Sequence, residues 1–347
     1  MSATVLYRKY RPQSFAEVRN QEHIVSVLEG AITKGTIPHA LLFAGTRGTG
    51  KTTLARLFAQ ALQVSEVDVY EIDAASNRGI DDIRELREAV HTVPYESPYK
   101  VYIIDEVHML TKEAFNALLK TLEEPPAHVI FILATTEEQK LPDTILSRCQ
   151  TFTMREPTRA QLAEAVTDMA KKEGFTLEAD AADLIAVAAD GSFRDAFSIL
   201  QKVILASGDT LGEADEVAAI IGAPTKSVLA DILLGIHESD STKALTAIAT
   251  AAEAHVDMEL LTRLILERMR AIMLIRNLPQ DSERIIGAFS VLDQETVQAI
   301  AKDTSSPINS HTLLRFLRVG QEVKTATIPP LPLELAIIDV TTPTQTT

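Results

Sequence analysis

The sequence has 347 residues, 46% of them hydrophobic and 23% charged, with a formal net charge of −15. These values suit a globular protein of two or three domains, and the negative charge excludes bulk attraction to DNA, so a nucleic-acid contact requires a local basic patch or backbone N–H groups. The single cysteine, Cys149, excludes an intramolecular disulfide and a cysteine-rich zinc site. Residues 1–20 lack the apolar core of a signal peptide, and charges interrupt the most apolar helix, so we expect a cytoplasmic protein without a membrane segment.

The first part of the chain contains a glycine-rich motif framed by a predicted strand and a predicted helix. A basic and aromatic segment, residues 7–12, precedes a predicted helix over residues 21–34, and the apolar residues 40–44 predict a buried strand. The loop after this strand fits the phosphate-binding pattern G-x-x-x-x-G-K-[ST] and leads into a predicted helix over residues 52–62. The alternative, a flexible turn of Gly and Thr, is disfavoured because a strand precedes the pattern and a helix follows it.

The residue types of this loop suit a nucleoside triphosphate. Glycines keep side chains away, so that backbone N–H groups can surround the phosphates, and the start of the following helix adds its positive dipole end. Lys51 is placed to reach the β- and γ-phosphates, and the Thr52 hydroxyl to ligate Mg²⁺. We therefore predict a site for ATP and Mg²⁺. The predicted loop residues are Gly45, Thr46, Arg47, Gly48, Thr49, Gly50, Lys51, Thr52 and Thr53.

Two acids end the third predicted strand. After a predicted strand over residues 67–73 and a predicted helix over residues 80–93, the apolar residues 101–104 run into Asp105 and Glu106, as in a buried parallel strand whose carboxyl end reaches a ligand crevice. We predict that Asp105 holds Mg²⁺ through its water shell and that Glu106 polarises an attacking water. The alternative is that these acids merely end a strand, but the phosphate-binding pattern upstream favours the catalytic interpretation.

The elements that follow complete an α/β pattern. A predicted helix over residues 111–124 stops at two prolines, and a buried strand over residues 129–134 is followed by Thr135 and Thr136. A hydroxyl there, for which we choose Thr135, is placed to position the water or to touch the γ-phosphate. A short helix ends at residues 147–149, and residues 151–154 predict the last strand. This alternation over about 155 residues predicts a doubly wound parallel sheet.

From Pro157 onward the strand signals end and only helices are predicted. Gly222 to Pro224 resembles a boundary, and Pro329, Pro330 and Pro332 break the helical pattern near the end. The predicted helices cover residues 159–173, 179–189, 192–207, 212–221, 226–236, 241–254, 258–276, 281–292, 293–302 and 310–325. We expect the small, polar end of the chain, residues 336–347, to be disordered.

These motifs, in this order, resemble the AAA+ ATPases and, among them, the tau/gamma family of clamp-loader subunits of bacterial DNA polymerase III. The phrases that carry the resemblance are residues 7–12, 39–53, 72–76, 104–110, 116–126, 133–136, 140–142, 146–149 and 191–196. The resemblance implies an α/β AAA+ P-loop domain over residues 1–156, a helical lid over residues 157–222 and a helical collar domain over residues 223–335. It is dense over residues 5–200 and weak beyond about residue 225.

The resemblance also assigns roles to arginines that their surroundings in the sequence do not reveal. Arg148 has the position of an arginine finger, which reaches the ATP of a neighbouring subunit, and Arg194 has the sensor-2 position, which contacts ATP from the lid of its own subunit. Arg11 and Pro12 resemble a segment that packs near the adenine. Without the family, Arg148 and Arg194 would be interpreted as surface arginines. We further expect apolar helix faces in the collar to hold the neighbour, for example Leu260, Leu261, Leu264 and Ile265.

The function implied is that of an ATP hydrolase in a DNA-replication clamp loader. Such a subunit joins other clamp-loader subunits in a ring, for which we expect five members, and opens a sliding clamp to load it on primer–template DNA. Arg78, the start of the helix over residues 80–93, and Lys112 are the candidate DNA contacts. The family usually has a four-cysteine zinc module after the helix that ends near Leu62. Here residues 63–68 lead directly to the next strand, so we predict no zinc.

Two other functions remain as alternatives. The first is another AAA+ DNA-remodelling ATPase, such as a branch-migration or recombination factor, which the phrases over residues 121–126 and 147–149 disfavour. The second is a ring scaffold subunit that does not hydrolyse ATP. The intact Lys51, Thr52, Asp105 and Glu106 argue against it.

Overall fold

The computed structural model describes residues 5–207, 213–287, 289 and 291–342. Contacts along the chain divide it into two compact units, each with its own core. Unit 1 consists of Met1–Ala165 and Ala189–Gln201, and unit 2 of Val166–Ala188 and Lys202–Thr347.

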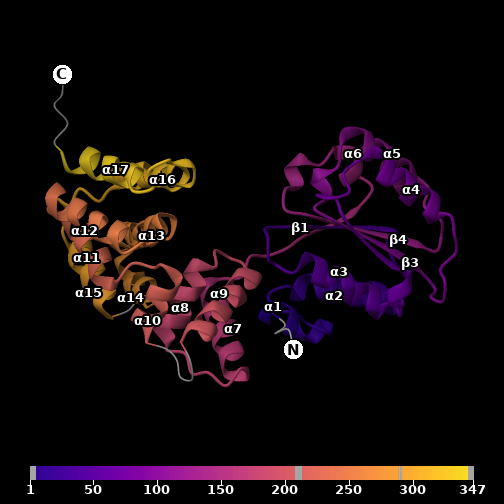
Figure 1. The fold of residues 1–347 in the computed structure, drawn as a ribbon, viewed down its shortest axis with the longest axis horizontal. Coiled ribbons are helices and arrows are strands. Elements are labelled where there is room, and N and C mark those ends of the chain that lie inside the picture. Colours follow the sequence, from indigo (N-terminus) through magenta and orange to yellow (C-terminus); the bar gives the residue numbers. More distant parts are fainter. Residues whose placement is uncertain (1–4, 208–212, 288, 290, 343–347) are drawn as a thin grey trace. The chain divides into compact units, whose positions relative to one another are not determined.

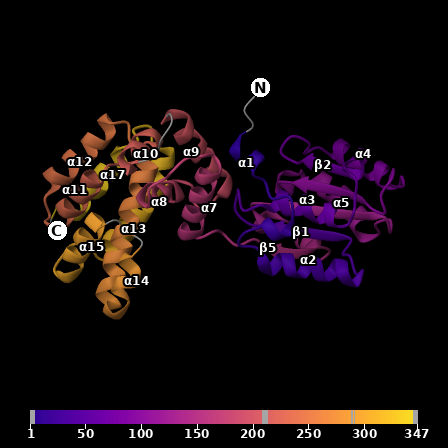
Figure 2. The same ribbon diagram turned by 90° about the horizontal axis from the view of Figure 1, so that it is seen from below.

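Unit 1 is built on a parallel sheet of five strands. The strands are β1 (Ala40–Ala44), β2 (Val69–Asp73), β3 (Lys100–Asp105), β4 (Val129–Thr135) and β5 (Gln150–Thr153). Their order is β2-β3-β4-β1-β5, with β2 and β5 at the edges (Figure 2). Because every pairing is parallel, the carboxyl ends of the strands meet at one edge of the sheet, where Asp73 is in register with Asp105 and Ala44 with Thr135. The predicted doubly wound α/β architecture is confirmed.

Helices cover both faces of this sheet (Figure 1). The helices of unit 1 before residue 150 are α1 (Leu6–Lys9), α2 (Glu22–Lys34), α3 (Lys51–Ala61), α4 (Ile80–Val90), α5 (Lys112–Glu123) and α6 (Asp143–Leu146). Successive side chains of a strand point to opposite faces. Phe43 and Ile103 therefore pack with α2 and α3, whereas Leu42 and Ile104 pack with α4 and α5. Apolar residues on both faces explain why the strands read as continuous hydrophobic runs.

The second strand and the fourth helix are shorter than predicted, and buried polar groups explain both differences. The strand predicted over residues 67–73 begins only at Val69, because the fully buried Asp68 accepts hydrogen bonds from the N–H groups of Tyr95, Glu96 and Ser97 and thereby fixes a turn. The helix predicted to reach residue 93 ends at Val90. The buried Lys100 ammonium donates a hydrogen bond of 2.8 Å to the Ala89 carbonyl, which lies in the last turn of this helix, and so takes the place of a further helical N–H.

The remainder of the chain is helical. Its helices are α7 (Arg159–Lys172), α8 (Ala179–Ala188), α9 (Phe193–Ala206), α10 (Ala214–Ile221), α11 (Lys226–His237), α12 (Ser241–Glu253), α13 (Met258–Asn277), α14 (Ser282–Ile286), α15 (Val291–Lys302), α16 (Ser310–Glu322) and α17 (Leu331–Thr341). Among the described residues no single helix is long and apolar enough to cross a membrane. Only α10 and α11 taken together, with a bend of 80° between them, pass that test of length and composition.

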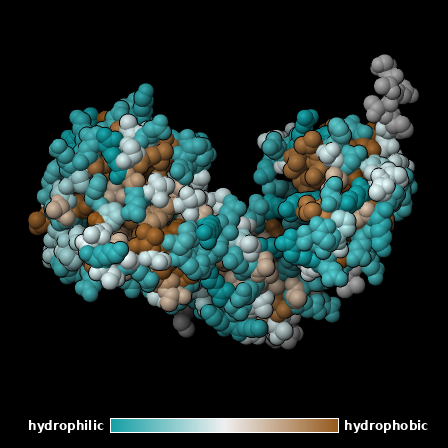
Figure 3. Space-filling model, turned by 180° about the vertical axis from the view of Figure 1, so that it is seen from behind, coloured by the Kyte–Doolittle hydropathy of each residue, from teal (hydrophilic) through white to brown (hydrophobic). Residues whose placement is uncertain are grey.

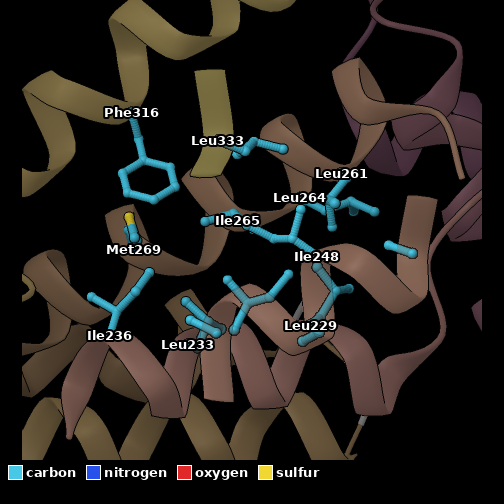
Figure 4. Close-up of a cluster of buried hydrophobic side chains, with 14 of the residues drawn as sticks. Leu229, Leu233, Ile236, Ile248, Leu261, Leu264, Ile265, Met269, Phe316 and Leu333 are labelled. Carbon is cyan, nitrogen blue, oxygen red and sulfur yellow. The ribbon is translucent and has the colours of Figure 1, made fainter. Parts of the chain in front are cut away.

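Helix α13 forms the centre of the core of unit 2 (Figure 4). Its Leu261, Leu264 and Ile265 contribute to a cluster of buried side chains that also includes Leu233 of α11 and Phe316 of α16. The expectation that Leu260, Leu261, Leu264 and Ile265 face a neighbouring subunit was therefore wrong: all four are at most 6% exposed. An apolar helix face has the same pattern whether it meets its own core or a partner.

Three further corrections concern the last quarter of the chain. The helix predicted over residues 281–292 ends at Ile286, followed by Gly287, and a separate helix begins at Val291. The prolines that we expected to end the helical pattern instead start α17, because Pro330 and Pro332 lie at its first turn, where a missing N–H costs little. The predicted disordered tail was wrong for residues 336–341, where Ala336 and Ile337 are buried, and its residues 343–347 lie outside the described residues.

Candidate nucleotide-binding site

The glycine-rich loop leaves β1 at the carboxyl edge of the sheet and leads into α3. Two of its glycines have surroundings that a side chain would not fit. Gly48 has φ +78°, and a Cβ there would lie 1.9 Å from the Ser192 Oγ. Gly45 has φ +154°, and a Cβ there would lie 2.7 Å from the Met154 Cβ. The loop therefore presents backbone rather than side chains, as binding of phosphates by N–H groups requires.

Lys51 lies against this loop and is only 6% exposed. Its Nζ donates hydrogen bonds of 2.8 Å to the carbonyl oxygens of Gly45 and Thr46. Burial lowers the pKa of Lys51, whereas the nearby Glu106 and Asp105 carboxylates raise it. An ammonium group with few water contacts, held next to a loop of backbone N–H groups, is suited to binding a phosphate oxygen.

The two predicted magnesium ligands are in contact. The Thr52 hydroxyl, at the start of α3, donates a hydrogen bond of 2.7 Å to Asp105 Oδ2 at the end of β3. A hydroxyl and a carboxylate oxygen are hard ligands of the kind that Mg²⁺ takes from proteins, together with phosphate oxygens and water. These residues therefore fit the predicted metal.

A single pocket brings together most of the predicted nucleotide-site residues. It is lined by Arg11, Arg47, Gly48, Gly50, Lys51, Thr52, Thr53, Asp105, Glu106 and Arg194. Four of these side chains are cationic and two are anionic, which suits a triphosphate carrying one divalent cation. Burial lowers the pKa of Arg11, and so do the charges of Arg56, Arg194 and Arg8, whereas the Glu71 carboxylate raises it. This crowding of guanidinium groups favours binding of an anion.

Arg194 reaches the pocket from the start of α9. Ser192 precedes this helix, and its hydroxyl accepts a hydrogen bond of 3.1 Å from the Asp195 N–H. The same Ser192 lies against Gly48, so the start of α9 directly contacts the glycine-rich loop. Sequence reasoning did not identify this serine, although it stands within the phrase over residues 191–196.

Glu106 has a strained backbone and a fixed carboxylate. Its φ of +49° and ψ of +44° lie in the left-handed region, which is uncommon for a residue with a side chain. Glu106 Oε2 accepts hydrogen bonds from the Thr136 hydroxyl at 2.9 Å and from the Thr136 N–H at 3.3 Å. The end of β4 thus holds the carboxylate that we predict to polarise water.

Thr135, the hydroxyl chosen from the sequence, is fully buried and has other partners. Its Oγ1 lies 3.0 Å from His108 Nδ1 and accepts a hydrogen bond of 3.0 Å from the Glu137 N–H. The contact with Glu106 comes from the next residue, Thr136. Sequence reasoning chose Thr135 from this pair of threonines, and it missed His108 altogether.

Arg148 and Pro12 do not line the pocket. Arg148, after α6, donates a hydrogen bond of 2.6 Å to Glu123 Oε1 and one of 2.8 Å to the Thr144 carbonyl. Its side chain is 32% exposed. Two of the candidate DNA contacts, Arg78 and Lys112, come from segments that are joined by a backbone hydrogen bond. The N–H of Thr111, the residue before Lys112, donates a hydrogen bond of 3.1 Å to the Arg78 carbonyl.

Three family models match successive parts of the chain. The first is described as DNA polymerase III, delta subunit, and covers residues 62–158. The second, DNA polymerase III clamp loader subunit, ATPase lid domain, covers residues 161–209. The third, DNA polymerase III subunits gamma and tau domain III, covers residues 213–346.

Similar proteins give a consistent result. The DNA polymerase III subunit tau of Bacillus subtilis is 36% identical over 98% of this chain and 63% of its own length, and that of Escherichia coli is 38% identical over 86% and 50%. The chain thus spans between half and two thirds of these relatives. Among solved structures, the Thermotoga maritima RuvB Holliday junction branch migration motor has a TM-score of 0.51 at 22% identity, covering 71% of this chain and 86% of that chain. That likeness concerns the fold alone.

Proposed function

This chain belongs to the family of the gamma and tau subunits of bacterial DNA polymerase III, and we propose that it is an ATPase subunit of a DNA-replication clamp loader. It uses ATP binding and hydrolysis to open a sliding clamp and to load the clamp on primer–template DNA. The observation that carries this proposal is one pocket that contains Lys51, Thr52, Asp105 and Glu106 together with Arg194. A scaffold subunit that only binds its neighbours would not need the pair of acids.

Within this proposal each side chain of the pocket has a separate task. Lys51 and the N–H groups of residues 45–52 bind the phosphates, and Arg194 contacts them from α9. Thr52 and Asp105 would hold Mg²⁺, which when bound neutralises charge on the phosphoryl group. Glu106 orients and polarises the attacking water, and the two hydrogen bonds from Thr136 keep its carboxylate in place.

The test is the rate of ATP hydrolysis by the purified chain, alone and in a ring with other clamp-loader subunits, with and without a sliding clamp and primed DNA. We expect Mg²⁺-dependent hydrolysis that clamp and primed DNA stimulate together. Strand separation in a helicase assay without any clamp would instead favour a branch-migration or recombination factor. Absence of hydrolysis in a single turnover, despite bound ATP, would favour a scaffold subunit.

An exposed apolar surface in unit 2 supports assembly with neighbouring subunits. On α16, Leu314 and Leu317 are 57% and 51% exposed, and on α17 Leu335 and Ile338 are 47% and 43% exposed. Their spacing of three residues puts each pair on one side of its helix. Figure 3 shows hydrophobic surface on the part of unit 2 where Figure 1 has α16 and α17. We propose that this α16–α17 surface contacts the next subunit of a five-membered ring.

This surface leads to a prediction about assembly. Leu335→Asp should weaken association between subunits, because the substitution would bury a charge in an apolar interface. It should change the free energy of unfolding by no more than about 0.5 kcal/mol, since the side chain is exposed. Sedimentation velocity would measure association, and thermal unfolding would measure stability. As a control, Leu333→Asp, in the core, should unfold the chain. Unchanged association of the Leu335 variant would exclude this surface from the interface.

The remaining proposals concern metal content, DNA and compartment. We propose that the protein works in the cytoplasm and that Arg78, Lys112 and the start of α4 contact the DNA.

We further propose that the protein binds no zinc, because only residues 62–65 separate α3 from the short helix before β2. Elemental analysis of the purified protein should detect less than stoichiometric zinc. One tightly held zinc ion per chain would contradict this prediction.

A further inference from the structure

His108 is a histidine with a buried side chain for which the proposed mechanism has no task. It stands in η3 (Val107–Met109), two residues after Glu106, and its side chain is 6% exposed. It does not line the pocket and so has no direct access to a nucleotide there. A buried imidazole must find polar partners, and the identity of those partners indicates what the residue does.

Each ring nitrogen of His108 faces an acid, and the acids belong to different elements. Nδ1 lies 3.0 Å from Thr135 Oγ1 and 3.4 Å from Glu106 Oε2. Nε2 lies 3.3 Å from Glu137 Oε1. Glu137 directly precedes η4 (Glu138–Lys140), and its carboxylate also binds the Lys140 ammonium at 2.8 Å. The imidazole therefore links the segment after β3 to the segment after β4.

His108 is also connected to the Glu106 carboxylate indirectly, through the hydrogen bonds of residues 135–137. Thr135 Oγ1, the partner of His108, accepts the Glu137 N–H, and the residue between them, Thr136, donates two hydrogen bonds to Glu106 Oε2. His108 thus contacts Glu106 directly and also holds the turn that carries Thr136. Because the backbone of Glu106 is in the left-handed region, its conformation needs such support from its surroundings.

We propose that His108 is a positioning residue for ATP hydrolysis, which holds the Glu106 carboxylate toward the nucleotide pocket by tying it to Thr135 and Glu137. The inference rests on the proposed function, because it concerns the residue that polarises the attacking water. It assigns His108 no contact with ATP and no part in binding it. Its loss therefore affects the chemical step and leaves nucleotide affinity unchanged.

The first experiment separates binding from chemistry. In rings with clamp and primed DNA, His108→Ala should lower kcat by about ten- to a hundredfold, the size of effect that a small displacement of a catalytic group produces. The Kd for ATP, measured by calorimetry, should stay within about twofold of that of the unaltered chain. His108→Asn offers an N–H group near the position of Nδ1 but nothing at Nε2, so it should recover much of the lost rate. His91→Ala, at an exposed histidine after α4, is the matched control.

The second experiment tests whether His108 acts through Glu106. If it does, His108→Ala added to Glu106→Gln should lower kcat no further than Glu106→Gln alone, because the residue it positions is already disabled. A merely structural role for His108 would give an additional loss in the double variant. If His108→Ala fails to fold, the same comparison is made with His108→Asn and Glu137→Gln, which keep polar groups in place.

Three results would overturn the inference: an unchanged kcat, an additive loss of kcat in the double variant, or a Kd for ATP that rises well beyond about twofold. An unaltered chain that binds ATP without hydrolysing it would refute the proposed function itself, and the inference with it. Hydrolysis by the unaltered chain together with a fully active His108→Ala variant would refute the inference alone.

Discussion

Replacing Lys51 by alanine is expected to weaken ATP binding by roughly ten- to a hundredfold. The ammonium lies against the glycine-rich loop, where a charge-assisted hydrogen bond to a phosphate oxygen would contribute about 1.5–3 kcal/mol. Isothermal calorimetry with ATP and Mg²⁺ measures the effect. Because Lys51 also binds two backbone carbonyls, thermal unfolding without nucleotide should be recorded in parallel, so that a loss of stability is not mistaken for a loss of affinity.

Lys34→Ala is the control for this prediction, since it removes an exposed lysine from the last turn of α2. It should bind ATP with the affinity of the unaltered chain. A Lys51→Ala variant that folds and keeps its full ATP affinity would show that the loop is not the phosphate site. The dependence of ATP binding on Mg²⁺ supplies a second check. Asp105→Ala should make ATP binding less dependent on Mg²⁺, because it removes a predicted ligand of the metal.

Local sequence predicted those parts of the site that are continuous in the chain. A phosphate-binding loop needs glycines and a lysine at fixed spacing, so Gly45 to Thr52 could be identified without knowing any long-range contact. Asp105 and Glu106 could be predicted because the carboxyl ends of parallel strands meet at one edge. The doubly wound sheet followed from the alternation of apolar strands and helices, and the structure confirms it.

The parts that sequence alone did not predict depend on contacts between distant segments. Arg11 and Arg194 line the same pocket although they come from opposite ends of the sequence of unit 1. Only the family resemblance indicated them. A choice between Thr135 and Thr136 requires the direction in which each hydroxyl points at the end of β4, which the residue type does not reveal. Leu264 and Leu317 both occupy apolar helix positions, yet one is buried and the other exposed, because that difference depends on which helices pack together.

The largest effects are expected if Arg148, as proposed, completes the site of a neighbouring subunit. Arg148 is outside its own pocket and partly exposed, as a residue that acts on a neighbour must be. An arginine supplied in this way is worth roughly 10³–10⁵ in rate in small GTPases, and loss of a general base costs about 10²–10⁴. Arg148→Ala and Glu106→Gln should therefore each bind ATP nearly normally and hydrolyse it at least about tenfold more slowly.

Mixing the two variants tests whether Arg148 acts across an interface. In mixed rings some interfaces combine an intact Glu106 with an intact Arg148, so with clamp and primed DNA part of the activity should return. Arg284→Ala, which removes an exposed arginine paired with Asp281 at 3.8 Å, is the control and should leave the rate unchanged. Mixed rings that form but stay inactive would contradict the assignment. Arg148 would then serve its own subunit, where the pairs with Glu123 and the Thr144 carbonyl fix it between α5 and α6.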